Sequence, residues 1–479
     1  MCFFLFSWFG CKTSQTTVAS TNADVIIRNV HLIDAATGLR PSQTVLLRGN
    51  RIVDVRAEMP TRTTPNTHVI DGTGRYLIPG LWDAHVHLVF EPDLTSSMFR
   101  LFLAHGVTSV RDTGGQLHLV KPERDRSQQD PTAAPRVKIA GPLLDGLPVV
   151  YDGKSPFNPH LGVGAGNIST ANELVDSFLA ANVDLLKAYE MLQPEVFRRI
   201  LLRGQSADVP VTGHVPLSMD VVDAVDAGLT SMEHLRNLEF SCSSDWKDLL
   251  VQRQQLLATG RDSSGAVLRR NIHNAQRSHA VRYQDADRRN LVLRKLADEQ
   301  VWQIPTMTIM LAFTERFFMR PDWQASFDYL PESTRRRWAD NSARFAQSPV
   351  PESAKRYSAW FKEMIGHLKT ANVPLLAGTD CPIFYLTPGY SLHEELALLV
   401  ANGLTPLEAL DAATHGPARY FKMDRELGLI EPGMLADLVM LDANPLEDIT
   451  NTRRIHTVIR DGRVYDRAAL DELLRADRN

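Results

Sequence analysis

Two histidines separated by one residue are the first side chains in this sequence with the chemistry of a metal site. His85 and His87 lie in an apolar stretch, residues 78–88, and side chains two apart on a strand point the same way. Imidazole is the commonest protein ligand for zinc and similar ions. The pair therefore predicts half of a metal site, with a surface or core pair of histidines as the alternative.

Four further side chains of related chemistry follow later apolar runs. They are Lys187, His214, His234 and Asp380, and each lies near the C-terminal end of its predicted strand. A single histidine or lysine is usually a surface or hydrogen-bonded residue. Six such residues at the same end of successive parallel strands would meet at one mouth, which is the catalytic face of a barrel.

The strands that would position these residues alternate with helical stretches. Helical patterns cover residues 170–181 and 219–227, as parallel strands joined by crossovers require. The eight predicted strands are residues 78–88, 106–110, 137–140, 183–187, 209–214, 229–234, 302–305 and 373–378. Eight such units over about 340 residues predict an α/β fold of the (β/α)8 TIM-barrel type, with a doubly wound sheet as the alternative.

Both ends of the chain have the character of a β-sheet. Short β-branched runs separated by turns occupy residues 25–27, 43–47, 52–55, 68–72, 436–441 and 455–464. We therefore expect a small β-sandwich formed by residues 23–78 and 425–479. The barrel, residues 79–424, would be inserted between these two parts.

Two stretches are longer than a plain barrel needs, and both follow the C-terminal ends of predicted strands. Residues 241–299 are rich in Arg and Gln. Residues 307–370 carry many aromatic side chains, among them Trp323, Phe327, Tyr329, Trp338, Phe345, Tyr357, Trp360 and Phe361. One interpretation is a helical lid that shapes the substrate pocket. The other is a solvated helical decoration whose aromatic residues form its own core.

The composition is that of a globular protein and argues against some classes of partner. The 479 residues are 44% hydrophobic and 23% charged, and the formal net charge is −4. This charge gives no reason to expect nucleic acid or an anionic membrane as a partner. The four cysteines show no CxxC spacing, so neither a zinc ribbon nor a disulfide framework is indicated.

Residues 1–22 have the features of a targeting segment. Residues 3–9 are apolar, Gly10 and Cys11 follow, and residues 12–22 are polar. This order resembles the cleavage site of a bacterial lipoprotein. We expect export to the periplasm, with or without a lipid anchor at Cys11. The alternative is a disordered leader on a cytoplasmic protein.

The order His-x-His, Lys, His, Glu-His and Gly-Thr-Asp on successive strands resembles the amidohydrolase superfamily of metal-dependent hydrolases. The resemblance covers residues 24–466, and the chain looks similar to the branch that holds imidazolonepropionase-related enzymes and binuclear Xaa-Pro dipeptidases. Residues 106–114 and 403–410 are further stretches typical of this group.

The resemblance implies a binuclear centre with two divalent ions, expected to be Zn²⁺. His85, His87 and Asp380 would hold one ion. His214 and His234 would hold the other. Lys187 would bridge the ions as a carbamate formed with CO2, because a bare ammonium has no lone pair and would repel a dication. The alternative is a mononuclear site with Lys187 uncarboxylated.

The resemblance also implies that a metal-bridging hydroxide hydrolyses an amide C–N bond. Asp380 would act first as general base and then as general acid. The expected small-molecule substrate is a dipeptide or an N-acyl amino acid, which makes the protein a prolidase-like dipeptidase or an N-acyl amino acid amidohydrolase. The alternatives are a hydrolase of cyclic amides or imidazolones, and a catalytically silent barrel that acts as a binding module. Relatives often form homo-oligomers.

Three residues are predicted to contact the substrate, and two of them, Tyr189 and His160, are also candidates for catalysis. Tyr189 shares a strand face with Lys187 and would donate to a carbonyl or carboxylate, with packing as the alternative. His160, in a loop after the third strand, and Arg111, on the second strand, would contact a carboxylate. A plain loop histidine and a structural ion pair are their alternatives. Glu233 would support its neighbour from the opposite strand face.

Overall fold

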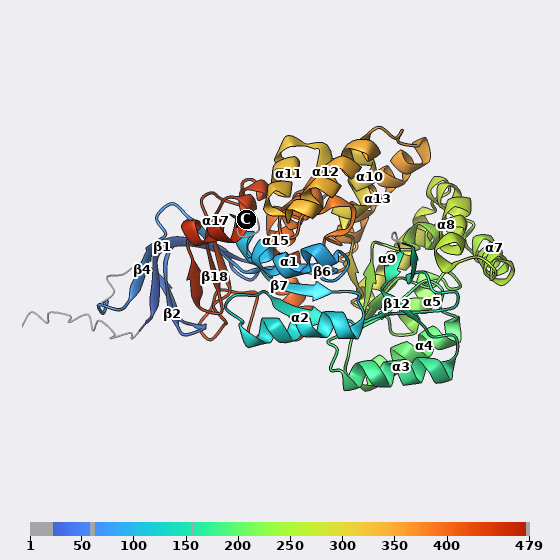
Figure 1. Cartoon of the computed structure of the whole chain (residues 1–479), viewed down its shortest axis with the longest axis horizontal. Coiled ribbons are helices and arrows are strands. Elements are labelled where there is room, and N and C mark those ends of the chain that lie inside the picture. Colours follow the sequence, from blue (N-terminus) through green and yellow to red (C-terminus); the bar gives the residue numbers. More distant parts are fainter. Residues whose placement is uncertain (1–22, 58–62, 156–157, 476–479) are drawn as a thin grey trace, which may run out of the picture.

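The computed structural model describes residues 23–57, 63–155 and 158–475. The predicted leader and Cys11 lie outside these residues, so export remains a prediction. The chain folds into a β-rich part built from both ends and a larger part in which helices surround parallel strands (Figure 1). No helix among the described residues has the length and apolar character needed to cross a bilayer.

Strands from the two chain ends pair in one sheet of eight strands. Its order is β19-β18-β17-β5-β1-β2-β3, and β4 pairs with β1 beside this path. The strands are β1 (Val25–Asp34), β2 (Gly38–Arg48), β3 (Arg51–Ala57), β4 (His68–Asp71), β5 (Tyr76–Pro79), β17 (Leu438–Leu441), β18 (Ile455–Arg460) and β19 (Arg463–Tyr465). The two ends join because β17 lies antiparallel to β5, with Leu438 opposite Pro79. This pairing gives one sheet, and the β-sandwich remains a prediction.

The parallel strands of the larger part fall into two sheets. One has the order β6-β7-β8, and the other has the order β12-β9-β13-β14-β15-β16. The strands are β6 (Leu81–Val86), β7 (Val107–Asp112), β8 (Arg136–Ile139), β9 (Leu143–Asp145), β12 (Gly162–Gly164), β13 (Leu186–Ala188), β14 (Val211–Gly213), β15 (Ser231–Glu233) and β16 (Trp302–Ile304). Most of their residues are buried, as parallel strands covered by helices require.

Residues 373–381 connect the two parallel sheets by single bridges. Leu375 pairs with Gln303 of β16, and Cys381 pairs with Val86 of β6. The strand expected at residues 373–378 is therefore reduced to one bridge, and that expectation was wrong. The reason is that the segment does not bond only to neighbouring strands: the N–H of Leu376 donates to Gln303 O at 2.9 Å, but the N–H of Ala377 donates to Ala412 O at 2.8 Å. The fold is α/β, but the described strands do not pair into one continuous ring.

Several short strands were not predicted. They are β5, β9 and β12, together with the hairpin of β10 (Asp152–Ser155) and β11 (Asn158–His160). Each has only three or four residues, and elements of that length are too short to show a hydrophobic period.

Helices follow many of the parallel strands. The predicted helices at 170–181 and 219–227 correspond to α3 and α5. In the first part of the barrel region the helices are α1 (Pro92–Ala104), α2 (Leu117–Gln129), α3 (Ile168–Ala180), α4 (Pro194–Ser206) and α5 (Val221–Asp226). After residue 382 they are η3 (Ile383–Tyr385), α14 (Tyr390–Ala401), α15 (Pro406–Ala412), α16 (His415–Tyr420), η4 (Ile449–Arg453) and α17 (Arg467–Arg475).

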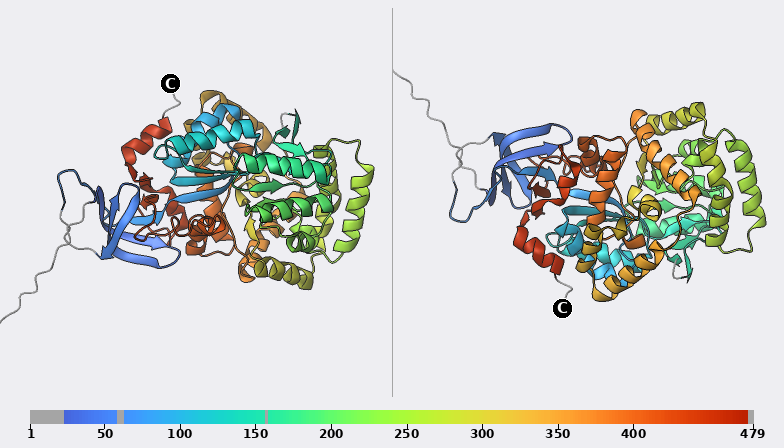
Figure 2. Two further views of the ribbon diagram at one scale, coloured as in Figure 1. Left: turned by 90° about the horizontal axis from the view of Figure 1, so that it is seen from below. Right: turned by 90° about the horizontal axis from the view of Figure 1, so that it is seen from above.

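The two long insertions are helical. The first holds α6 (Leu238–Ser241), α7 (Trp246–Thr259), α8 (Gly265–Arg282) and α9 (Ala286–Asp298). The second holds α10 (Met307–Glu315), η1 (Phe317–Met319), α11 (Pro321–Ser326), η2 (Phe327–Tyr329), α12 (Glu332–Ala346) and α13 (Glu352–Thr370). Figures 1 and 2 place α7 and α8 at the end of the molecule opposite the sheet of the chain ends.

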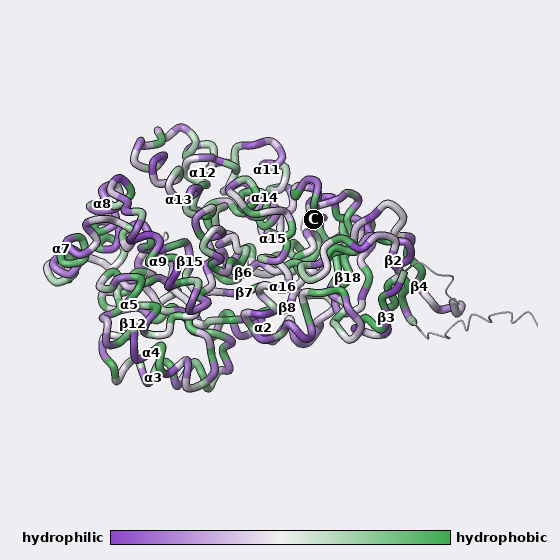
Figure 3. Tube along the Cα trace, turned by 180° about the vertical axis from the view of Figure 1, so that it is seen from behind, coloured by the Kyte–Doolittle hydropathy of each residue, from purple (hydrophilic) through white to green (hydrophobic). Residues whose placement is uncertain are grey.

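The aromatic residues of the second insertion pack against one another. Trp323, Trp338 and Phe361 are at most 2% exposed, and Phe327 contacts Trp338 with ring centroids 5.5 Å apart. The same residues belong to the main hydrophobic core together with barrel residues such as Val86 and Val110, so the expectation of a separate aromatic core is not met. The first insertion differs, because α8 carries many hydrophilic residues, whereas β18 and its neighbours are strongly hydrophobic (Figure 3).

Candidate metal centre

His85 and His87 present the same ring atom to one point at the end of β6. His85 Nε2 lies 3.3 Å from Asp380 Oδ1, and His87 Nε2 lies 3.1 Å from the same oxygen. The opposite ring atoms are held by partners: Nδ1 of His85 lies 2.6 Å from Glu233 Oε2, and Nδ1 of His87 lies 3.0 Å from the carbonyl oxygen of Gly114. Such partners fix the ring orientation and leave Nε2 for a metal.

Asp380 reaches this point from an irregular segment with a constrained backbone. Its φ is 68°, in the left-handed region, and the preceding Thr379 is tied to Asp83 by backbone and side-chain hydrogen bonds of 3.0 and 2.6 Å. Gly378 leaves no room for a side chain, because an added Cβ would lie 2.8 Å from His85 Cβ. Burial acts to raise the pKa of the Asp380 carboxyl, but the histidines beside it hold that pKa well below its usual range.

The three residues have the donor set and the unsatisfied atoms of a cation site. His85 Nε2 and Asp380 Oδ1 are buried and have no hydrogen-bond partner. Ligand atoms of His85, His87 and Asp380 all lie within 4.8 Å of one another. Two imidazole nitrogens and a carboxylate oxygen suit zinc and related divalent ions, so a metal fits this site.

The other three predicted ligands line the same cavity. Lys187 lies on β13, and His214 and His234 directly follow β14 and β15. The rings of His214 and His234 are 5.0 Å apart, and His234 Nε2 lies 3.8 Å from Asp380 Oδ2. Burial lowers the pKa of Lys187 to about 8, and its Nζ forms an ion pair with Glu233 Oε1 at 3.9 Å.

Glu190 and Glu233 are buried carboxylates that support the candidate ligands from behind. Glu190 Oε1 lies 2.6 Å from His214 Nδ1, and Glu233 accepts from both His85 and Arg111. Although burial acts to raise the pKa of each carboxyl, cationic neighbours hold both pKa values well below the usual range. Arg269 is the strongest such neighbour of Glu190, and Arg111 is that of Glu233.

The cavity at this centre is small, with a volume of about 70 Å³. Besides the six candidate ligands, its lining consists of Leu143, Tyr151, Leu161, Tyr189, Arg236, Arg269 and Ile383. Tyr189 stacks near His214, with ring centroids 4.4 Å apart. The cavity therefore places an aromatic ring and two arginines directly beside the candidate ligands.

The three residues that were predicted to contact the substrate lie in different places relative to the cavity. Tyr189 lines the cavity. His160 is exposed on β11 and is not among the cavity residues. Arg111 is fully buried and is not among the cavity residues; its Nη2 donates to Glu233 Oε1 at 2.7 Å, so it forms a structural ion pair with Glu233 and not with the neighbouring Asp112 that was the alternative prediction.

The structure adds site residues that the sequence analysis did not select. Glu190 directly follows Tyr189 and was missed because adjacent strand residues are expected to face away from each other. Arg236 lies two residues after His234, a spacing that could have suggested it. Arg269 belongs to α8, more than thirty residues further along the chain, and no local pattern places it at the cavity.

Comparison with known proteins gives partial matches in sequence. A model of the amidohydrolase family matches residues 354–465. The adenine deaminase of Staphylothermus marinus is 32% identical over 99 residues, which are 20% of this chain and 16% of that protein. The chain thus spans less than a fifth of that relative. The imidazolonepropionase of Geobacillus sp. strain WCH70 is 22% identical over 408 residues, 83% of this chain and 82% of that protein.

Solved structures match over most of the chain. A Xaa-Pro dipeptidase with bound methionine in its active site has a TM-score of 0.66 at 18% identity, covering 92% of this chain and 99% of that one. A bottromycin amidohydrolase has a TM-score of 0.68 at 25% identity, covering 94% of this chain and 89% of that one. At 18% identity, the likeness to the dipeptidase is one of fold.

Proposed function

The chain belongs to the amidohydrolase superfamily, and we propose that it is a metal-dependent hydrolase that cleaves an amide C–N bond in a small linear substrate. The observation that carries this proposal is the convergence of His85, His87 and Asp380 on one point, with unsatisfied buried atoms facing it. A silent binding module would have no need of this donor set. The proposed scaffold is a (β/α)8 barrel in which residues 373–381 take the place of the eighth strand.

We assign the metal centre two divalent ions, with zinc as the proposed metal. His85, His87 and Asp380 would hold one, and His214 and His234 the other. Lys187 would carry a carbamate between them, which supplies two anionic oxygens where the bare side chain has none. Bound divalent ions supply Lewis acidity and lower the pKa of water, so that a nucleophile exists near neutral pH.

The protein's own residues then orient groups and move one proton. Glu190 and Glu233 hold the Nδ1 atoms of His214 and His85, so both rings keep Nε2 toward the centre. The Asp380 carboxylate, which lines the cavity, accepts the proton of the attacking water and returns it to the leaving nitrogen. The Tyr189 hydroxyl donates a hydrogen bond to the carbonyl oxygen as negative charge develops there.

The proposed substrates are dipeptides, in particular those with Xaa-Pro bonds, and N-acyl amino acids. The fold likeness to a Xaa-Pro dipeptidase supports this class. The second candidate is hydrolysis of a cyclic amide or imidazolone. It is favoured by the alignment with an imidazolonepropionase over 82% of that protein's length and by the small cavity.

The test is amine release by zinc-loaded protein across four groups of compounds. They are Xaa-Pro dipeptides, other dipeptides, N-acyl amino acids, and small lactams with imidazolone. We expect release from linear compounds that chelation abolishes and zinc restores. Turnover of the cyclic compounds alone would replace the proposal by the second candidate. No turnover by protein that binds two ions would refute both.

A further inference from the structure

A second cavity opens directly beside the metal centre. It has a volume of about 360 Å³ and is lined by Asn158, Arg236, Ala266, Arg269, Arg270, His273, Asn274 and Arg277. Arg236 and Arg269 line both this cavity and the metal cavity. We call the larger cavity the arginine vestibule. Most of its lining comes from α8, at the outer end of the molecule in Figure 1.

The arginine vestibule carries an excess of positive charge. Four arginines line it, and none of the described residues in its lining is Asp or Glu. The carboxylates behind it are Glu190, which pairs with Arg269 at 2.8 Å, and Glu239, which pairs with Arg277 at 3.1 Å. Burial holds the pKa of His273 well below its usual range, so this imidazole is neutral. Among the described residues, no carboxylate lies in hydrogen-bond contact with the other two arginines, Arg236 and Arg270.

Of the two arginines that line both cavities, Arg236 has more unused hydrogen-bonding capacity than Arg269. Its Nε is buried without a hydrogen-bond partner, and its only ion-pair contact among the described residues is Glu190 Oε1 at 4.0 Å. That oxygen already lies within 2.9 Å of both His214 Nδ1 and Arg269 Nε. A guanidinium in this state is set up to bind another anion, and its planar fork suits a carboxylate.

The sizes and shared lining of the two cavities indicate where such an anion would bind. The metal cavity, about 70 Å³, is the smaller of the two, and the arginine vestibule is about 360 Å³. Because Arg236 and Arg269 line both cavities, a linear substrate at the metal cavity can extend past them into the arginine vestibule. Charged groups that line a cleft of low dielectric also raise the local concentration of an oppositely charged ligand.

We propose that the arginine vestibule is a carboxylate-binding subsite in which Arg236, assisted by Arg270, binds a carboxylate carried by the part of the substrate that extends beyond the scissile bond. This inference rests on the proposed function for its use in catalysis. It names the residues that would bind the carboxylate which dipeptides and N-acyl amino acids carry.

The first test measures binding without turnover. The probes are glutarate and 1,5-pentanediol, which have the same chain length and contain no bond that an amidohydrolase can cleave. Calorimetric titration of the zinc-loaded protein is expected to show that Arg236→Gln weakens glutarate about 10- to 100-fold, because a hydrogen bond to a charged group is lost. Binding of 1,5-pentanediol should not change. Equal glutarate affinity in wild type and Arg236→Gln would overturn the proposal.

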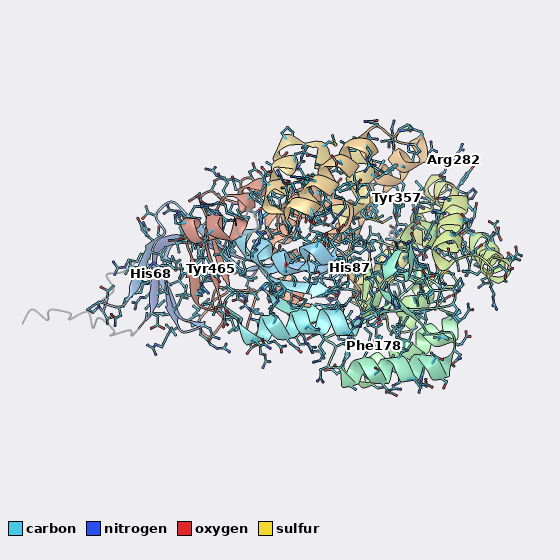
Figure 4. All side chains as sticks on the ribbon, in the orientation of Figure 1. His68, His87, Phe178, Arg282, Tyr357 and Tyr465 are labelled. Carbon is cyan, nitrogen blue, oxygen red and sulfur yellow. The ribbon has the colours of Figure 1, made fainter. Side chains whose placement is uncertain are left out.

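Two further variants distinguish binding at the arginine vestibule from a general effect of removing a positive charge. Arg270 is exposed, so Arg270→Gln keeps the fold and is expected to weaken glutarate several-fold. Arg282→Gln is the matched control, because Arg282 ends the same helix but lines a different cavity, far from His87 in Figure 4. It should bind glutarate as the wild type does. Equal weakening by Arg236→Gln and Arg282→Gln would indicate a general charge effect and overturn the proposal.

The second test uses pairs of substrates that differ only in a free carboxylate or a carboxamide. Arg236→Gln should raise KM about 10- to 100-fold for the carboxylate and leave kcat/KM for the carboxamide within a few-fold. If no compound releases amine but glutarate binding still depends on Arg236, the proposed function fails and the subsite stands. If amine is released and Arg236→Gln alters neither glutarate binding nor KM, the subsite fails and the function stands.

Discussion

Glu190 and His214 are joined by a contact of 2.6 Å between Oε1 and Nδ1, and this contact connects the metal cavity to the arginine vestibule. The same carboxylate is paired with Arg269 at 2.8 Å, and its other oxygen lies 2.5 Å from His273 Nε2. The buried Glu190 carboxylate thus orients the candidate metal ligand His214 and neutralises Arg269, which lines both cavities.

Replacing Glu190 by Gln should loosen one metal ion and keep the other. Gln cannot accept from His214 with a full negative charge, and loss of such a partner costs about 10- to 100-fold in metal affinity. Metal content measured by mass spectrometry at limiting zinc should fall toward one ion per chain. Glu239→Gln is the control, because Glu239 is a buried carboxylate that pairs with Arg277 and contacts no candidate ligand. Two retained ions in Glu190→Gln would remove this role.

Replacing Asp380 by Asn should lower kcat by about 10²- to 10⁴-fold, because the proton carried from water to the leaving nitrogen loses its acceptor. The measurement is kcat on the best substrate of the panel, together with metal content on the same sample. An Asp380→Asn variant that keeps both ions and wild-type turnover would show that another group moves the proton.

The carbamate predicts a chemical rescue. Lys187→Ala removes the bridge and should reduce both zinc content and activity. A short carboxylic acid such as propionate, added at millimolar concentration, can occupy the vacated space with two oxygens and should restore part of both. Lys138→Ala is the control, since Lys138 is paired with Asp184 outside the metal cavity. Zinc content in Lys187→Ala equal to that of the wild type would show that Lys187 does not hold the metal.

Gly378 predicts a structural test of how Asp380 is positioned. An added Cβ would lie 2.8 Å from His85 Cβ, His85 N and Ile304 Cγ2, so Gly378→Ala should cost about 1–3 kcal/mol of stability and weaken zinc binding. The midpoint of thermal unfolding and zinc content measure both effects. Gly366→Ala is the matched control, because its added Cβ has no contact closer than 3.7 Å, and alanine is favoured in a helix interior by up to about 1 kcal/mol.

Glu395 predicts a pH dependence of stability outside the metal centre. Burial raises the pKa of its carboxyl from 4.5 to about 7, against hydrogen bonds from Met307 and Thr308 at the start of α10. Between pH 4.5 and 7 the folded state therefore binds more protons than the unfolded state. The stabilisation is complete below about pH 4.5 and is lost as pH rises through about 7, with a slope of at most about 1.4 kcal/mol per pH unit.

The comparison of wild type with Glu395→Gln isolates this group. Gln cannot titrate, so the wild-type unfolding midpoint should fall relative to that of the variant as pH rises from 5 to 7. Above pH 8 the difference between the two should become constant. Parallel midpoints across the whole range would show that the hydrogen bonds from Met307 and Thr308 keep Glu395 ionised throughout.

The sequence by itself determined the superfamily, the α/β class and the identity of residues that meet at the metal centre. His85 and His87 share a face because a strand has a period of two, and Lys187, His214 and His234 each occur at the end of a short apolar run. These patterns are local in the sequence, so they can be recognised without knowing how the elements pack. The family model over residues 354–465 and the alignment with an imidazolonepropionase over 83% of the chain agree with the superfamily prediction.

Only the tertiary structure decided the surroundings of those residues. It pairs Arg111 with Glu233 rather than with substrate, and it brings Arg269 of α8 to a cavity lined mainly by strand-end residues. It also takes residues 373–378 out of a regular strand, because the backbone N–H of Ala377 donates to Ala412 O rather than to a neighbouring strand. Each of these contacts joins residues far apart in the chain. Their formation depends on how whole elements pack, which no periodicity within one segment records.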